Sequence, residues 1–390
     1  MKMPRRLVLV SFLGILYTWV WLELKMIKDS ASMRGIILSG DSSSSGTSNF
    51  TQTRRLNTNN NYLHWPKIWN EPIKAYSTPS NNTSATVVMC LIVRNETVYL
   101  DEFVDYYIAL GVTHIYIYDN EPTPDLEFES WYERRFDIHP YVTIQHEPRN
   151  PGQQQAYERC LFHDSNNATY AAMFDIDEFL VLKQHTNIID MLNEYCDEEC
   201  GQISFNWVTI GTSNQTSYKP YPVTKRNVHL HTYEPLTTII KTIVRPTYVK
   251  DPMDWSHSVL LKKGHWVDTN GVRIPRVHSL TRVKRPPYQW SRGPTNVAAL
   301  YHYRFKSEAE FVNKVCNRGD ALEKRPVPGG SDAKFPKCIN IKKPQNYPRT
   351  GGVYDDTAWK FMKRICPRYG IYDQLNEEEL LEMRRTSLLY

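Results

Sequence analysis

Acidic residues follow two strand-like apolar runs, and their types suit cation binding. Asp175 and Asp177 come directly after the run 170–174, and Asp119 follows the run 112–118. In extended backbone, residues two apart point the same way, so Asp175 and Asp177 are predicted to present two carboxylates to one cation. Carboxylate oxygens suit Mg²⁺ or Mn²⁺. An ion held there could grip a diphosphate leaving group.

Two other metal motifs fail at this position. A phosphoryl hydrolase of the D-x-D-x-T type needs a hydroxyl where Phe179 stands. A calcium EF-hand loop needs a ligand at Phe179 and a glycine at Leu180. No Ser, Cys or His nucleophile motif is found, so a metal-dependent phosphoryl hydrolase is disfavoured.

Alternating strand and helix patterns precede these acidic residues. The apolar run 85–93 predicts a buried strand, and 97–110 has helical spacing with Gly111 as its stop. A further strand is predicted at 142–145 and a helix at 153–163. This alternation predicts an α/β fold with a mostly parallel, Rossmann-like sheet, in which ligands bind beyond the carboxyl ends of the strands.

The pattern changes after residue 200 and becomes more irregular. Ser307 and Glu310 fit a capping box that opens a helix through Val315, and a last helix is expected at 376–385. The Pro-, Gly- and Lys-rich region 317–354 is interpreted as long ordered loops. Strands are expected at 203–210, 237–244 and 258–261.

Composition excludes several classes of protein. Of 390 residues, 41% are hydrophobic and 23% charged, which excludes a wholly disordered chain. The net charge of +5 argues against a dedicated nucleic-acid binder. The aromatic content of 12% suits an ordinary core, and it also suits sugar stacking. The aromatic residues to test for sugar stacking are Trp207, Tyr233, Trp255, Trp266, Tyr288 and Trp290.

The N-terminal segment predicts a membrane anchor. Residues 1–6 are basic and 7–22 carry no charge. A cleaved signal peptide competes with an uncleaved anchor, but the bulky Trp21 and Leu22 disfavour cleavage. We expect a cytosolic tail (1–6), a transmembrane anchor (7–24) and a disordered stalk (25–84). The rest would be lumenal, in a single-pass type II protein of the Golgi or another secretory membrane.

The cysteines and sequons fit a secretory compartment. Seven Cys predict disulfides with one thiol left over, and Cys90 is expected to be that thiol. Cys196 and Cys200 lack the second ligand pair of a zinc site, so a disulfide is expected there. Glycosylation sequons begin at Asn49, Asn81, Asn82, Asn95, Asn167 and Asn214, and the first three are the best candidates.

Several motifs in a fixed order resemble glycosyltransferase family 92 and its family 2 relatives, over about residues 85–320. A set of motifs in this order is far more specific than any one of them. They are 87–96, 99–103, 111–120, Q-x3-Y-x2-C from Gln153 to Cys160, 175–179, Trp207 with Gly211, 241–246, His257, 302–307, 310–311 and 318–319.

This resemblance implies a GT-A fold and a transferase. It divides the lumenal domain, 85–390, into a nucleotide-sugar half (85–200) and an acceptor half (201–390). It implies an inverting enzyme that moves a hexose, galactose first, from a UDP-sugar to a glycan acceptor with Mn²⁺ or Mg²⁺. The alternative is a catalytically inactive carbohydrate-binding or scaffold protein of the same fold. The intact pair Asp175 and Asp177 argues against it, because an inactive relative has no need to hold buried like charges together.

The resemblance also implies roles for individual residues. The expected metal ligands are Asp175, Asp177 and His302, with Glu178 shaping their site. The expected donor-binding residues are Arg94, Asn95 and Glu96 at the nucleotide mouth, Asp119 at the base or ribose, and Lys306 at the diphosphate. An inverting transfer also needs a carboxylate base, for which Asp254 is the first choice, with Asp268 and Asp320 left open.

Overall fold

The computed structural model describes residues 72–80, 84–165, 167–231, 236–250, 257–274, 293–319, 338 and 350–387. All described residues belong to one compact unit, Tyr62–Tyr390. The predicted tail, the anchor and most of the stalk therefore lie outside the described residues. Within the described part, no helix is both long enough and apolar enough to cross a membrane.

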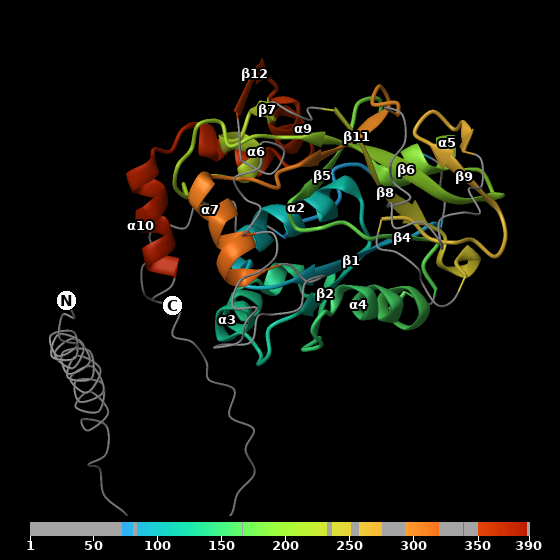
Figure 1. The fold of residues 1–390 in the computed structure, drawn as a ribbon, viewed down its shortest axis with the longest axis horizontal. Coiled ribbons are helices and arrows are strands. Elements are labelled where there is room, and N and C mark those ends of the chain that lie inside the picture. The colour runs from blue at the N-terminus through green and yellow to red at the C-terminus, as the bar shows by residue number, and fades with distance from the viewer. Residues whose placement is uncertain are drawn as a thin grey trace, which may run out of the picture. The chain divides into compact units, whose positions relative to one another are not determined.

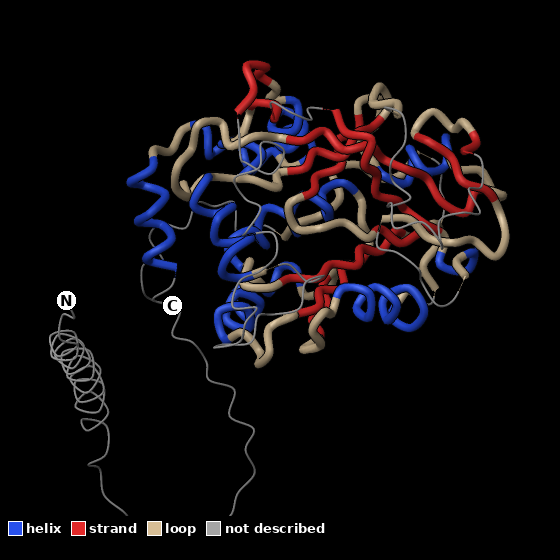
Figure 2. The backbone as a smooth tube through the Cα atoms, viewed as in Figure 1, coloured by secondary structure: helices blue, strands red, loops and turns tan. Residues whose placement is uncertain are grey.

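A ten-stranded mixed sheet forms the centre of this unit (Figures 1 and 2). Its main order is β10-β9-β6-β8-β4-β1-β2-β3, and β11 pairs with both β5 and β6. A second, two-stranded sheet pairs β7 (His229–His231) with β12 (Thr350–Tyr354). The large sheet contains β1 (Val87–Val93), β2 (His114–Asp119), β3 (Val142–His146), β4 (Tyr170–Ala172), β5 (Glu178–Leu182), β6 (Cys200–Thr209), β8 (Leu236–Val244), β9 (His265–Asp268), β10 (Arg273–Ile274) and β11 (Ala298–His302).

Helices cover both faces of the sheet. The helices are α2 (Leu100–Leu110), α3 (Leu126–Arg134), α4 (Gln153–Arg159), α5 (Ile188–Tyr195), α6 (Val223–Arg226), α7 (Glu308–Val312), α9 (Thr357–Ile365) and α10 (Glu377–Ser387). The 3₁₀ turn Thr97–Tyr99 comes directly before α2. The π-helical turn Cys160–Asp164 follows α4, and the π-helical turn Asn313–Arg318 follows α7.

The strand directions confirm a mixed α/β fold with a mostly parallel sheet. β3, β2, β1 and β4 run parallel to their neighbours. β8 then runs antiparallel to both β4 and β6. Parallel pairing returns where β6 meets β9 and β11.

The continuous apolar run of β1 is explained by burial on both faces. Successive side chains of a strand point to opposite faces, so β1 contributes to two clusters. Val87, Met89, Leu91 and Val93 join the cluster that contains the buried side chains of α2, and Val88, Cys90 and Ile92 join the cluster that contains those of α4. The sheet is therefore the middle layer between α2 and α4.

Local signals in the sequence set the ends of two elements. Gly111 ends α2 in the left-handed region, with φ of 102°, as predicted. Ser307 and Glu310 form both hydrogen bonds of the predicted capping box at the start of α7. The predicted helix at 153–163 is also found, divided between α4 and the π-helical turn after it.

The prediction that Cys90 is unpaired is wrong. Cys90 forms a disulfide with Cys160, and the free cysteine is the buried Cys366. Cys90 was expected to be buried, and it is. It faces α4, however, and the turn that follows α4 brings Cys160 to it across 70 residues of sequence. A buried strand position thus does not exclude a disulfide.

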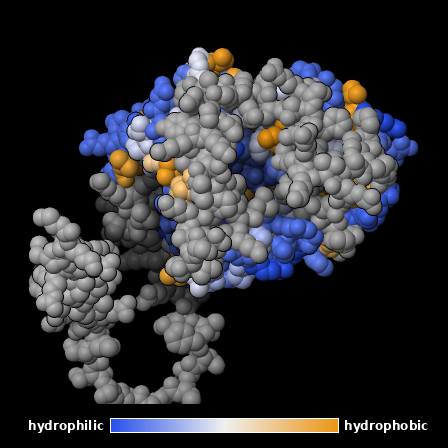
Figure 3. Space-filling view, in the orientation of Figure 1, coloured by the Kyte–Doolittle hydropathy of each residue, from blue (hydrophilic) through white to orange (hydrophobic). Residues whose placement is uncertain are grey.

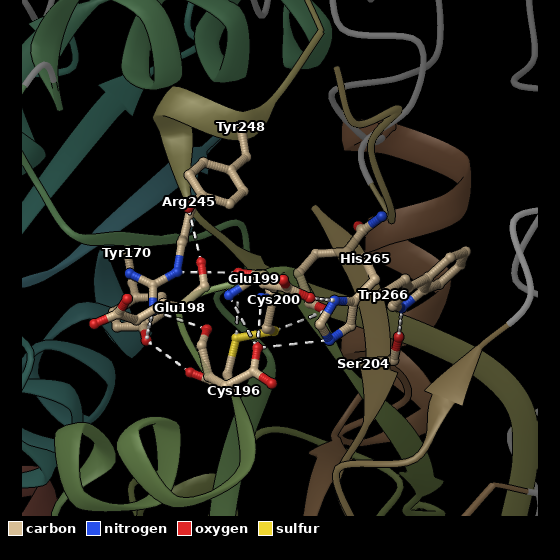
Figure 4. Close-up of a disulfide and its surroundings, with 12 residues drawn as sticks. Tyr170, Cys196, Glu198, Glu199, Cys200, Ser204, Arg245, Tyr248, His265 and Trp266 are labelled. Atoms are coloured by element: carbon tan, nitrogen blue, oxygen red, sulfur yellow. Dashed lines mark hydrogen bonds and ion pairs between the residues drawn. A yellow bond between two sulfur atoms is a disulfide. The ribbon is translucent and has the colours of Figure 1, made fainter. Parts of the chain in front are cut away.

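Cys196 and Cys200 form the predicted disulfide, which closes the connection from α5 to β6 (Figure 4). Arg245 Nε donates to Cys200 O at 3.0 Å. Tyr248 Oη donates to Glu198 O at 2.7 Å. These bonds fix the acidic connection against the end of β8, so the C-x3-C pattern is structural.

Two other expectations differ from the structure. The region 258–261 is not a strand, and Leu261 forms only an isolated bridge with Val249. The region 317–354, expected as loops, is largely outside the described residues, but it ends in strand β12. The described surface on the face shown in Figure 3 is mainly hydrophilic, with hydrophobic residues in separate small spots.

Candidate functional site

The segments that follow β1, β2 and β4 meet at one edge of the sheet. β1 pairs in parallel with β2 and with β4, so the carboxyl ends of all three lie on the same side. Residues 94–96 follow β1, Asp119 ends β2, and Asp175 comes shortly after β4. Open α/β sheets bind ligands at this edge.

Residues Asp175 to Glu178 form a tight turn between β4 and β5, which we call the acidic turn. Glu178 N donates to Asp175 O at 2.9 Å, and Asp175 N donates to Glu178 Oε2 at 2.8 Å. The expected extended backbone is therefore replaced by a turn. As a result, the carboxylates of Asp175 and Asp177 have different cationic partners.

One carboxylate oxygen of Asp175 accepts hydrogen bonds from three donors. Its Oδ1 accepts from Lys241 Nζ at 3.1 Å, Tyr157 Oη at 3.1 Å and Gln153 Nε2 at 3.2 Å. Its side chain is 34% exposed. Burial alone would raise the pKa of Asp175, but the ammonium of Lys241 outweighs it and lowers that pKa. Asp175 is thus an ionised carboxylate with its orientation fixed.

Lys241 on β8 lies under the acidic turn and is fully buried. Its Nζ is 3.7 Å from Glu178 Oε2 and donates to Met173 O at 3.2 Å. Burial raises the pKa of Glu178 well above its ordinary value. Lys241 is therefore the fixed counter-ion of Asp175, beside a carboxyl that favours its neutral form.

Asp177 is buried and its two oxygens face different groups. Oδ1 is 3.5 Å from His302 Nε2. Oδ2 is 2.6 Å from Lys314 Nζ and 3.7 Å from Lys306 Nζ. Burial alone would raise the pKa of Asp177, but Lys314 and Lys306 hold it well below its ordinary value.

Three cations gather beside Asp177, and we call them the cation cluster: Lys306, Lys314 and Arg318. Lys306 has a φ of 54° and lies over the ring of Tyr99, 4.2 Å from its centre. Its Nζ is also 4.0 Å from Glu96 Oε1. Arg318 Nη1 contacts Glu96 Oε2 at 2.6 Å and donates to the backbone oxygen of Arg94 at 2.7 Å. The structure therefore brings the predicted Glu96, Lys306, Asp177 and His302 together.

Two other predicted donor residues have structural partners. Asp119 closes the turn after β2 by accepting from Glu121 N at 3.0 Å and Asp125 N at 3.1 Å. The guanidinium of Arg94 donates from Nε to Asn120 Oδ1 at 3.1 Å. Both side chains are buried at the predicted edge. These side-chain contacts anchor the loops there, and Arg94 meets the cation cluster through its backbone oxygen, which accepts from Arg318.

Asn95 is exposed and has a φ of 47°, so it sits at a sharp turn after β1. It lines a small hollow that adjoins the cation cluster. The hollow is lined by Asn95, Glu96, Tyr99, Arg304, Phe305, Lys306, Glu310, Asn313, Lys314 and Arg318.

His302 ends β11 and is almost fully buried against an aromatic neighbour. The centre of its ring lies 4.0 Å from that of Trp207 on β6, and Trp207 also faces His257 at 5.5 Å. Trp207 is buried, so its ring is part of the core and not an open stacking surface. Burial lowers the pKa of His302.

The proposed base stays a prediction. Asp254 and Asp320 lie outside the described residues. Asp268 accepts from the backbone amides of Asn270 at 2.9 Å and Val272 at 3.1 Å, so it closes the β9–β10 connection. This gives Asp268 a structural role.

Three site residues were not predicted: Lys241, Lys314 and Arg318. Lys241 and Lys314 reach the acidic turn from 66 and 137 residues away. Lys314 and Arg318 are four apart, a spacing that places two cations on one helical face and could have indicated a shared site. Lys241 opens the family motif 241–246, but nothing in that motif indicates that its side chain reaches the acidic turn.

With this geometry in view, comparison with known sequences assigns the chain. The sequence model of glycosyltransferase family 92 matches residues 85–326. The chain belongs to glycosyltransferase family 92. A family 92 protein of Oryza sativa subsp. japonica is 23% identical over 157 residues, which are 40% of this chain and 26% of that protein. A family 92 protein of Ricinus communis is 26% identical over 122 residues, which are 31% of this chain and 20% of that protein. This family 92 chain thus matches about a quarter or less of these curated relatives' length.

Solved glycosyltransferases are similar at low identity. The mannosyltransferase PcManGT from Pyrobaculum calidifontis, in complex with GDP-Man and Mn²⁺, is 10% identical, with 83% of this chain and 86% of that chain covered and a TM-score of 0.33. GalNAc-T7 with UDP, GalNAc and Mn²⁺ is 8% identical, with 68% and 50% covered and a TM-score of 0.32.

Proposed function

We propose that this family 92 chain is a GT-A glycosyltransferase that moves a hexose from a UDP-sugar to a glycan acceptor with inversion. Galactose is the first sugar to test. The observation that carries the proposal is the arrangement around Asp177 at the carboxyl edge of the sheet. One oxygen of Asp177 faces His302, and the other faces Lys314 and Lys306.

The charges of the site suit a diphosphate leaving group. Breaking the bond between sugar and diphosphate leaves negative charge on the diphosphate, and fixed cations stabilise that charge. The cation cluster supplies two ammonium groups and one guanidinium. Asp177 and Glu96 hold these cations in place beside the hollow. The ligand would thus find its counter-charges already oriented.

The residues present also fit a divalent cation. A carboxylate oxygen and an imidazole nitrogen suit Mn²⁺, and Asp177 and His302 bring one of each together. Among the described residues no three His, Cys, Asp or Glu side chains converge as a metal group, so substrate or water would complete the coordination. Bound there, the ion would neutralise charge on the diphosphate. Asp175 stays a predicted further ligand.

The proposed cellular place is a secretory membrane, the Golgi first, with the described unit in the lumen. Support comes from the disulfides, which persist in oxidising compartments. They join Cys90 to Cys160, Cys196 to Cys200 and Cys316 to Cys338.

A transfer assay tests the proposed function. The full chain would be incubated with a panel of nucleotide sugars, Mn²⁺ and candidate glycans, with hydrolysis of the donor measured in parallel. We expect turnover of one UDP-hexose, and Asp177→Asn should lower kcat/KM by about 100-fold or more. Asp190→Asn is the matched control, because Asp190 contacts Ser80 on the surface, outside the site.

Two results would contradict the proposal. Turnover unchanged by Asp177→Asn would remove the site assignment. Glycan binding without any binding of nucleotide sugar would favour the inactive carbohydrate-binding alternative.

A further inference from the structure

Two buried polar atoms, on the neighbouring rings of Trp207 and His302, lack hydrogen-bond partners in the described part of the chain. Among the described residues, neither Trp207 Nε1 nor His302 Nδ1 makes a hydrogen bond. Trp207 is 9% exposed and His302 5%. Most buried polar side-chain atoms in native proteins are hydrogen-bonded, so two orphans on touching rings require an explanation.

Strand register places these two rings side by side. β6 and β11 run parallel, with Trp207 opposite Leu300 and Thr209 opposite His302. Residues two apart share a face, so Trp207 and His302 are diagonal neighbours on one face of the sheet. Their ring centres are 4.0 Å apart and the planes are inclined by 49°. The other nitrogen of His302, Nε2, faces Asp177 Oδ1 at 3.5 Å.

The chemistry of the two atoms selects a hydroxyl as their partner. The indole N–H of Trp207 can only donate. His302 Nδ1 accepts when Nε2 carries the ring proton, and donates when Nε2 is engaged by a cation. A hydroxyl oxygen has two lone pairs and one proton, so it satisfies Trp207 and either state of His302. An ammonium cannot be this partner, because it has no lone pair to accept from Trp207.

We propose that Trp207 and His302 form a subsite that reads one hydroxyl of the donor hexose. This rests on the proposed function, which places the diphosphate beside Asp177. The hexose is covalently joined to that diphosphate, so a hydroxyl of its ring is our candidate to fill the subsite. The subsite discriminates between hexoses by the hydroxyl that fills it.

Trp207→Phe tests the subsite, because it keeps an aromatic ring and removes the N–H. Transfer would be measured with the intact donor and with donors that each lack one ring hydroxyl. The wild-type chain should disfavour one of these deoxy donors by about 10- to 100-fold in kcat/KM, because the missing hydroxyl leaves the buried N–H of Trp207 without a partner. Trp207→Phe should lose activity with the intact donor by a similar factor. For Trp207→Phe, kcat/KM with that deoxy donor should equal kcat/KM with the intact donor. The Kd of the nucleoside diphosphate should be the same in the variant and the wild type.

Trp266→Phe is the matched control. Trp266 Nε1 already donates to Ser204 Oγ, so this change should leave discrimination between donors as in the wild type. Full discrimination in folded Trp207→Phe would overturn the subsite. If that variant fails to fold, the wild-type series decides, and the subsite is overturned if no deoxy donor costs more than about threefold. Absence of nucleoside diphosphate binding in the wild type would instead overturn the proposed function.

Discussion

At the scale of single residues, Lys241 shows how the fold supports the acidic turn. Its buried ammonium lies 3.1 Å from Asp175 and 3.7 Å from Glu178. Removing one partner of a buried ion pair leaves an uncompensated charge. We expect Lys241→Met to lower the free energy of unfolding by about 3 kcal/mol, measured by urea denaturation.

A double-mutant cycle separates this electrostatic role from simple packing. Asp175→Asn removes the charge that Lys241 neutralises, so Lys241→Met should cost less in that background. Equal costs in both backgrounds would contradict the assignment of Lys241 as counter-ion. Lys241→Arg, which keeps the charge, should retain more stability than Lys241→Met.

Cys366 gives a second prediction at this scale. Burial raises the pKa of its thiol to about 12, and the thiolate is the reactive form. In the folded chain Cys366 should resist alkylation at pH 8, and one thiol per chain should react once the protein is unfolded without reductant. Mass spectrometry would count the labels, and rapid labelling of the native protein would show that the site is open.

The sequence predicted the acidic members of the site better than their cations. Asp175 and Asp177 stand out because they follow a buried apolar run. Lys241 and Lys314 carry no such mark, since their role depends on a turn that sends each carboxylate in a different direction. That turn was itself missed, because D-I-D-E has no glycine or proline to indicate it.

At the scale of elements, Glu310 links three parts of the fold. It forms the capping box of α7, accepts from Tyr99 Oη at 2.6 Å and contacts Arg226 of α6 at 2.6 Å. Burial favours the protonated form of Glu310, but the hydrogen bonds and charge of Arg226 outweigh it and hold its pKa at about 2. The carboxylate of Glu310 thus links Tyr99, α6 and α7.

This depressed pKa predicts a pH dependence of stability. The folded pKa lies below the ordinary value of 4.5, so the stabilisation is present above about pH 4.5 and is lost as pH falls toward 2. Glu310→Gln should lose up to about 3 kcal/mol at pH 7, and less than half of that difference should remain at pH 3. Urea unfolding at both pH values measures it, and an equal difference at both would contradict the assignment.

The spacing of apolar residues along the sequence correctly predicted those elements whose buried residues recur at regular intervals. β1, α2 and β8 were predicted with small errors at their ends. α3 was missed because it is short and carries many polar residues. α5 was missed although its buried residues Ile188, Ile189, Met191 and Leu192 stand at helical spacing. β5 and β11 were missed because each is five residues long, and their pairing with each other is non-local.

At the scale of the whole molecule, the predicted anchor can be tested against the compact unit. The compact unit Tyr62–Tyr390 contains all described elements. We expect a fragment of these residues to fold, to bind nucleoside diphosphate like the full chain and to stay in the soluble fraction. The full chain should sediment with membranes and resist carbonate extraction. Release of the full chain by carbonate would contradict the anchor.

The C-terminal elements bear on how this family is delimited. The family pattern ends at residue 326, whereas α9 begins at Thr357 and buries Phe361, Met362 and Ile365 in the same core as β1 and α2. β12 also supplies the partner strand of β7. The sequence pattern that identifies the family therefore covers a shorter segment than the hydrophobic core does. This core can be completed only after α9 has been synthesised.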